Sequence, residues 1–93
     1  MDGYNPDAAG VQVGENVSIS YFNGRGEAAV DGEVVSAGGG RIVLSRDGGL
    51  RFHELTAVAG RDTHVVRSAR SRGRLNNIHA TELGEFTGIK VVE

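Results

Sequence analysis

The chain has 93 residues, a net charge of −2 and no cysteine. This length fits one domain with a single modest core, and the lack of cysteine excludes disulfides and thiolate metal sites. No apolar stretch approaches the roughly 20 residues of a membrane-spanning helix, so no membrane partner is expected. The polar segment 1–16 lacks the basic and apolar regions of a signal peptide, and we therefore expect a cytoplasmic protein.

The N-terminal segment, residues 1–12, is expected to be a flexible arm. Tyr4 is its only large apolar side chain before Val11, and Asn5-Pro6-Asp7 is a turn signal. Residues 13–93 are expected to form a single β domain, because short apolar runs alternate there with glycine-rich turns.

The first strand is expected over Val17–Phe22, where apolar and polar residues alternate, and Asn23-Gly24 predicts the hairpin turn that follows. The other expected strands, in chain order, are Ala28–Ser36, Arg41–Ser45, Leu50–Leu55, Thr63–Ser68 and Gly88–Val92. At most one short helical turn is expected, near residues 78–83. The pattern predicts an all-β fold, a small antiparallel barrel or strongly bent sheet of five to six strands.

Gly32 lies inside the second expected strand, where a glycine indicates a bend or a close approach of another backbone. A long strand bent at a glycine lets one strand serve both sides of a small barrel. From the alternation we expect a core of Val30, Val34, Ile42, Leu44, Leu50 and Phe52.

Residues 13–55 resemble the small β-barrels of Sm-like or KOW-type domains. The likeness is carried by Val13-Gly14-Glu15-Asn16-Val17-Ser18-Ile19, the hairpin Asn23-Gly24, the strand bent at Gly32, and Gly49 before Leu50. The resemblance implies binding of single-stranded RNA or of protein, often by rings of subunits.

Charge is distributed unevenly along the chain. Residues 1–60 hold eight acidic residues against four arginines, whereas residues 61–93 hold six basic residues against four acidic ones. Nine of the ten basic residues are arginine, whose planar guanidinium pairs with carboxylate or phosphate through two hydrogen bonds.

The arginine-rich segment after the fifth expected strand is the sharpest functional candidate. We expect Arg67, Arg70, Arg72 and Arg74 to bind single-stranded RNA or DNA, because in an extended chain the last three lie on one side, about 6.8 Å apart. The alternative is a solvated hairpin whose arginines pair with the chain's own Asp31, Glu33 or Glu54, or protect a sheet edge from aggregation. No aromatic residue between Phe52 and Phe86 offers a base a stacking platform.

Val35 and Val43 alternate out of phase with the expected core, which suggests an outward apolar face. Such a face is an interface in the second functional hypothesis, a protein-interaction or structural module that forms a homo-oligomer. The alternative is that the bent strands make both faces partly interior.

An enzyme is not expected. The sequence contains no catalytic arrangement of residues, and His53, His64 and His79 lie at spacings that fit no metal motif, so we expect no catalytic residues, metal or cofactor. Gly38-Gly39-Gly40 precedes a β-branched strand instead of a helix, and is therefore a turn and not a phosphate-binding loop.

Overall fold

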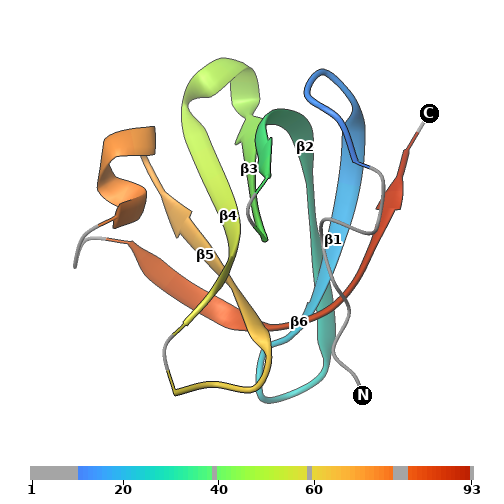
Figure 1. The fold of residues 1–93 in the computed structure, drawn as a ribbon, viewed down its shortest axis with the longest axis vertical. Helices are drawn as coiled ribbons and strands as arrows, with labels where there is room; N and C mark the ends of the chain where they lie inside the picture. The colour runs from blue at the N-terminus through green and yellow to red at the C-terminus, as the bar shows by residue number, and fades with distance from the viewer. Residues whose placement is uncertain (1–10, 39, 59, 77–79, 93) are drawn as a thin grey trace.

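The computed structural model describes residues 11–38, 40–58, 60–76 and 80–92. Six antiparallel strands follow one another around a closed barrel (Figure 1), which confirms the fold class expected from the sequence. The strands are β1 (Asn16–Phe22), β2 (Glu27–Gly38), β3 (Arg41–Arg46), β4 (Arg51–Ala57), β5 (His64–Ala69) and β6 (Thr81–Val91). Two 3₁₀ turns interrupt them, η2 (Asp47–Gly49) and η3 (Arg72–Asn76), and the described residues form no α-helix.

The barrel closes where β6 returns to β1. Val17 lies opposite Val91 and Phe22 lies opposite Glu85, and a register shift between Ser20 and Tyr21 bends this pair of strands. Closure pairs each of the six described strands on both sides, so none of them presents a free edge to another chain.

The barrel interior holds the main core, and the first four expected core residues are confirmed there. Leu50, in contrast, is 76% exposed, because β4 begins one residue later and Leu50 belongs to the turn before it. In β4 the inward residues are His53 and Leu55, while Phe52 packs into a second cluster. The expectation for Leu50 and Phe52 was wrong because the buried His53 breaks the apolar alternation of this strand.

That second apolar cluster lies outside the barrel wall. Leu75 of η3 is fully buried in it with Val43 and Ala69, and the partly buried Val35 and Phe52 pack around them. Val43 is 1% exposed, so the chain's own η3 covers the apolar face on which Val35 and Val43 were expected to form an interface.

At Gly32 the backbone of β2 lies close to the backbone of its neighbour β3. A Cβ atom on Gly32 would lie 2.8 Å from the backbone oxygen of Ser45 and 3.1 Å from the Cβ atom of Leu44. The pairing register shifts just beyond it, between Val34 and Ser36. The expected close backbone approach at Gly32 is therefore confirmed.

The last part of the chain differs most from the expectation. β6 spans Thr81–Val91 instead of 88–92, so the residues from Thr81 on are strand. Residues 77–79, where the helical turn was expected to begin, lie outside the described residues. Of the expected arm, residues 1–10 also lie outside the described part, and Val11 packs against the core.

Candidate anion-binding site

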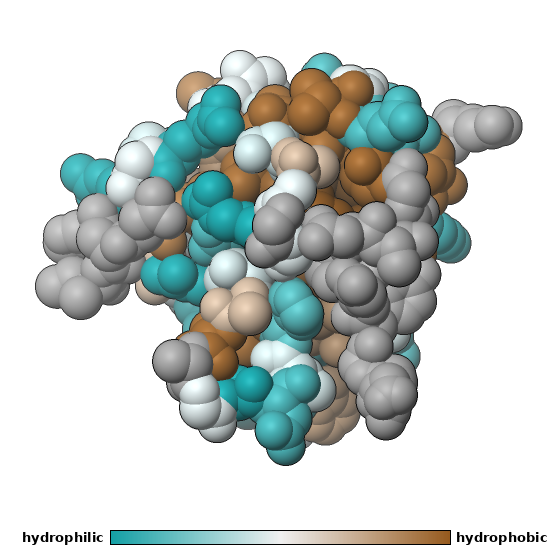
Figure 2. Space-filling model, in the orientation of Figure 1, coloured by the Kyte–Doolittle hydropathy of each residue, from teal (hydrophilic) through white to brown (hydrophobic). Residues whose placement is uncertain are grey.

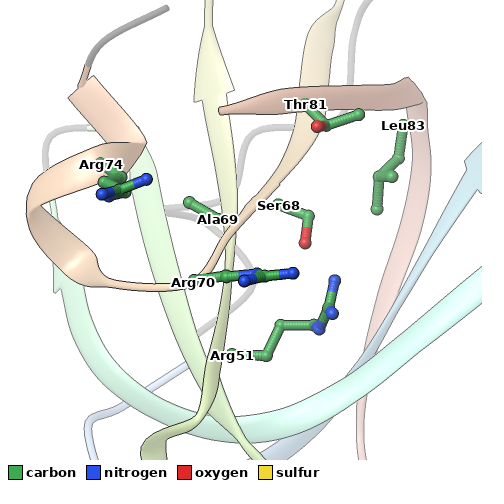
Figure 3. Close-up of a pocket in the computed structure, with 7 residues that line it drawn as sticks. All are labelled: Arg51, Ser68, Ala69, Arg70, Arg74, Thr81 and Leu83. Carbon is green, nitrogen blue, oxygen red and sulfur yellow. The ribbon is translucent and has the colours of Figure 1, made fainter. Parts of the chain in front are cut away.

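Three arginines from separate parts of the chain line one cavity of about 370 Å³ (Figure 3). Arg51 opens β4, Arg70 follows the last residue of β5, and Arg74 lies in η3. The other described lining residues are Ser68, Ala69, Thr81 and Leu83. The cavity thus lies where β4 begins, β5 ends and β6 begins.

The strand register places these residues together. Phe52 lies opposite Ala69 across β4 and β5, which puts the first residue of β4 beside the end of β5. Ser68 lies opposite Thr81 across β5 and β6, which adds the start of β6. After β5 the chain turns, and the backbone N–H of Arg74 donates to the carbonyl of Ser71 at 3.1 Å.

The three cavity arginines have no acidic partner among the described residues. The ion pairs found there join Arg41 and Arg67 to Glu54, and Arg61 to Glu82. Arg51, Arg70 and Arg74 are all exposed and make no such pair. Three uncompensated positive charges around one concave surface create a positive potential that attracts anions.

Two buried polar atoms without a partner lie on β4 and β5, and one of them, Ser68 Oγ, belongs to a residue that lines the cavity. Ser68 is 6% exposed and His53 is 3% exposed, and neither Ser68 Oγ nor His53 Nδ1 has a hydrogen-bond partner within the described ranges. The two residues are directly opposite each other across β4 and β5. Buried polar groups in folded proteins are normally hydrogen-bonded, so an unpartnered hydroxyl in the lining of a charged cavity needs an explanation.

The pKa of His53 is lowered from its ordinary value. Burial is the main cause, and the positive charges of Arg46 and Arg51 add to it, while Asp47 acts in the opposite direction. His53 is therefore neutral at pH 7, and the positive charge at the cavity comes from the arginines alone.

This lowered pKa predicts that stability falls as the medium becomes acidic. Below about pH 6.5 the unfolded chain takes up a proton on His53 that the folded protein does not, so the free energy of unfolding decreases from there down to the folded-state pKa. The slope for one proton is at most about 1.4 kcal/mol per pH unit. Urea unfolding of the native protein and of His53→Leu between pH 7.5 and 5 measures it, and identical pH profiles for the two proteins would contradict the prediction.

The expected nucleic-acid residues are divided by the structure. Arg70 and Arg74 line the cavity, Arg72 is exposed on η3 but does not line it, and Arg67 points to the buried Glu54. The expected extended run over 70–74 is wrong, because Arg72–Asn76 forms a 3₁₀ turn. Arg51 was missed, since its place beside Arg70 depends on the β4–β5 register and not on proximity in sequence.

Glu54 of β4 forms ion pairs with one arginine of β3 and one of β5 on the outer face of the barrel. Its side chain is 2% exposed, accepts a hydrogen bond from Arg41 Nε, and lies 3.4 Å from Arg67 Nη1. A buried carboxylate needs such partners, because its desolvation is costly when a partner is lost. The expected pairing of an arginine with Glu54 therefore holds for Arg67, which is structural in this arrangement.

We expect Arg67→Met to lower the free energy of unfolding by about 1–2 kcal/mol, because Glu54 then keeps only Arg41 among its two arginines. Glu82→Gln is the matched comparison, since it breaks the exposed pair with Arg61 and is expected to cost under about 1 kcal/mol. Urea unfolding measures both changes. An Arg67→Met protein of native stability would show that the Glu54 pair is not structural.

The described residues were also searched for a metal site and for a second ligand cavity. They contain no cluster of three or more metal-ligating side chains. A second cavity, of about 360 Å³, is lined by residues of both charges, among them Asp31, Glu33 and Arg46, and its described lining includes no unpartnered buried polar atom. The described residues form no helix that is long and apolar enough to cross a membrane.

The molecular surface separates polar and apolar regions. In Figure 2 hydrophobic surface gathers at the upper right, where Figure 1 places the start of β1 and the end of β6. The exposed apolar residues of the described chain include Val91, the last residue of β6, and Val92, which follows it. The side that carries β5 and η3 is more hydrophilic, as a surface for a charged partner would be.

The sequence matches no protein-family model, and neither curated proteins nor solved structures include a match to it. Function is therefore inferred from the geometry of the site alone.

Proposed function

We propose that the protein binds single-stranded nucleic acid through its phosphates, at the cavity formed by Arg51, Arg70 and Arg74. The observation that carries this proposal is that three arginines from separate parts of the chain line one cavity, with no carboxylate partner among the described residues. One guanidinium group can donate two parallel hydrogen bonds to a phosphate, and it stays charged at every physiological pH.

The proposed binding is independent of base sequence. The described lining of the cavity includes no aromatic side chain, so stacking of bases, which gives about 1–3 kcal/mol each in many single-strand binders, is not available within it. Phe22, at 49% exposure, lies on β1 and not in the cavity. Affinity then comes from contacts to the phosphate backbone, which carry no sequence information.

Relationship to the Sm-like or KOW-type domains is part of this proposal. The small closed meander supports it, as does the close approach of β2 to β3 at Gly32. A cytoplasmic location is part of the same proposal. Self-association through Val35 and Val43 has no comparable support, because Leu75 packs against this cluster within the chain.

The salt dependence of binding tests the proposal. For three arginine–phosphate contacts the slope of log K against log salt concentration is about −2, from roughly −0.7 per contact with a single strand. Fluorescence anisotropy with a labelled single strand of about 12 nucleotides, at several salt concentrations, measures this slope. A lack of binding even at low salt would overturn the proposal.

A further inference from the structure

A buried hydroxyl lies at the floor of the arginine cavity and faces its positive charges. Figure 3 shows the side-chain oxygen of Ser68 directed toward the guanidinium groups of Arg51 and Arg70. This oxygen has no hydrogen-bond partner in the described part of the chain, although Ser68 is more than nine-tenths buried. Thr81, its direct neighbour across β5 and β6, brings a second hydroxyl-bearing side chain to the same cavity.

The missing partner points to a ligand oxygen. A serine hydroxyl both donates and accepts, and a buried one is normally satisfied by protein or by a bound molecule. Arg51 and Arg70 are exposed at this position, so their long side chains can fold around an anion while its innermost oxygen meets Ser68.

The volume of the cavity limits the size of the group that can enter it. A volume of about 370 Å³ lies at the lower end of the range for small-molecule sites. This space suits a phosphate with its adjoining nucleoside.

The charge of the site also favours a terminal phosphate over an internal one. A phosphodiester carries one negative charge and two free oxygens, whereas a phosphomonoester carries about −1.5 to −2 charges at pH 7 and three acceptor oxygens. A cavity lined by three arginines and a buried hydroxyl therefore matches a phosphomonoester better than a phosphodiester.

We propose that the cavity is a phosphomonoester site, which holds the phosphorylated end of a single strand with Ser68 Oγ at the innermost phosphate oxygen. This inference rests on the proposed function and narrows it, because it states which phosphate of the strand enters the cavity. A free nucleoside monophosphate carries the same group and is the other source of this ligand.

The test compares strands that differ only at their ends. A mixed-sequence single strand of about 12 nucleotides is prepared with a 5′-phosphate, with a 3′-phosphate or with hydroxyls at both ends, and its dissociation constant is measured by fluorescence anisotropy. We expect one phosphorylated strand to bind at least about 10-fold more tightly than the hydroxyl-ended strand. Adenosine 5′-monophosphate and inorganic phosphate are then tested as competitors.

Ser68→Ala tests the assigned contact. This variant removes only the unpartnered oxygen, so the fold is retained, and the preference for a phosphorylated end is expected to fall about 5- to 10-fold. Ser71→Ala is the matched control, because Ser71 is exposed, lies three residues away and does not line the cavity. An unchanged preference in Ser68→Ala would overturn the assignment of Ser68.

The outcomes separate this inference from the proposed function. Equal affinity for phosphorylated and hydroxyl-ended strands would overturn the terminal-phosphate site and leave single-strand binding intact. Binding of the mononucleotide with no gain from a longer strand would overturn single-strand binding and leave the phosphomonoester site intact. Failure of every probe to bind would overturn both.

Discussion

Replacement of Arg51, Arg70 and Arg74 together by glutamine is expected to abolish the binding of single-stranded nucleic acid. Each arginine supplies a charge-assisted contact to phosphate, and the loss of three such contacts lowers affinity on the order of 100-fold or more. The salt slope is expected to fall from about −2 to near zero, with each single substitution removing about 0.7. Fluorescence anisotropy with a labelled single strand measures both quantities.

Arg61→Gln is the charge-matched control for each single substitution of a cavity arginine. Arg61 lies in the connection between β4 and β5, at the opposite end of this hairpin from Arg51 and Arg70. It is exposed and pairs only with the exposed Glu82 among the ion pairs described, so its loss is expected to leave the fold and the affinity unchanged. Equal losses of affinity in the Arg61 variant and the cavity variants would mean that binding follows net charge and not the cavity.

Arg67 distinguishes the structural proposal from the one made on sequence alone. On sequence it belongs with the nucleic-acid residues, but in the fold it is committed to Glu54 on the outer face. Substitution of Arg67 is therefore expected to lower stability while the salt slope of the folded protein stays near that of the native chain.

The alternation of apolar residues and the position of glycines are local signals, and they were sufficient to predict a small antiparallel barrel or bent sheet. The strands around Val17–Phe22 and Arg41–Ser45 were predicted nearly to the residue, because their inward positions are uniformly apolar. The same rule failed at Leu50 and Phe52, where a buried histidine takes an inward position and an exposed leucine occupies a turn. A two-letter pattern of apolar and polar residues cannot represent a polar side chain that folding buries.

The site was only partly predictable, for a different physical reason. Arg70 and Arg74 are close in sequence and their charge drew attention to the segment. Arg51 joins them only through strand pairing, and the unpartnered hydroxyl of Ser68 becomes visible only when its neighbours in space are placed. Similarly, no sequence signal distinguishes Arg67, which meets Glu54 across a pair of strands, from Arg70, which meets no acidic group in the described chain.

Gly84→Ala is expected to destabilise the barrel more than the loss of any ion pair described above. A Cβ atom at Gly84 would overlap the carbonyl oxygen of Phe22, and would lie 2.8 Å from the carbonyl carbon of Phe22 and 2.9 Å from Cδ2 of Tyr21. The obstructing atoms are mostly backbone, so no side chain can rotate away to relieve the overlap. We expect a loss of at least about 3 kcal/mol, because overpacking against backbone forces the strands apart.

The same strand supplies a control, and the comparison tests how the barrel closes. Gly88→Ala adds the same methyl group to β6 in open space, and is expected to be neutral or slightly stabilising. Thermal unfolding of the two variants is then expected to differ by roughly 12 °C or more, at about 4–8 °C per kcal/mol for a domain of this size. Gly84 pairs with Val66 on β5 while it contacts the end of β1, and its neighbour Leu83 lines the arginine cavity. Closure of the barrel and formation of the cavity therefore depend on the same close approach, and equal stability of the two alanine variants would show that β1 and β6 close without it.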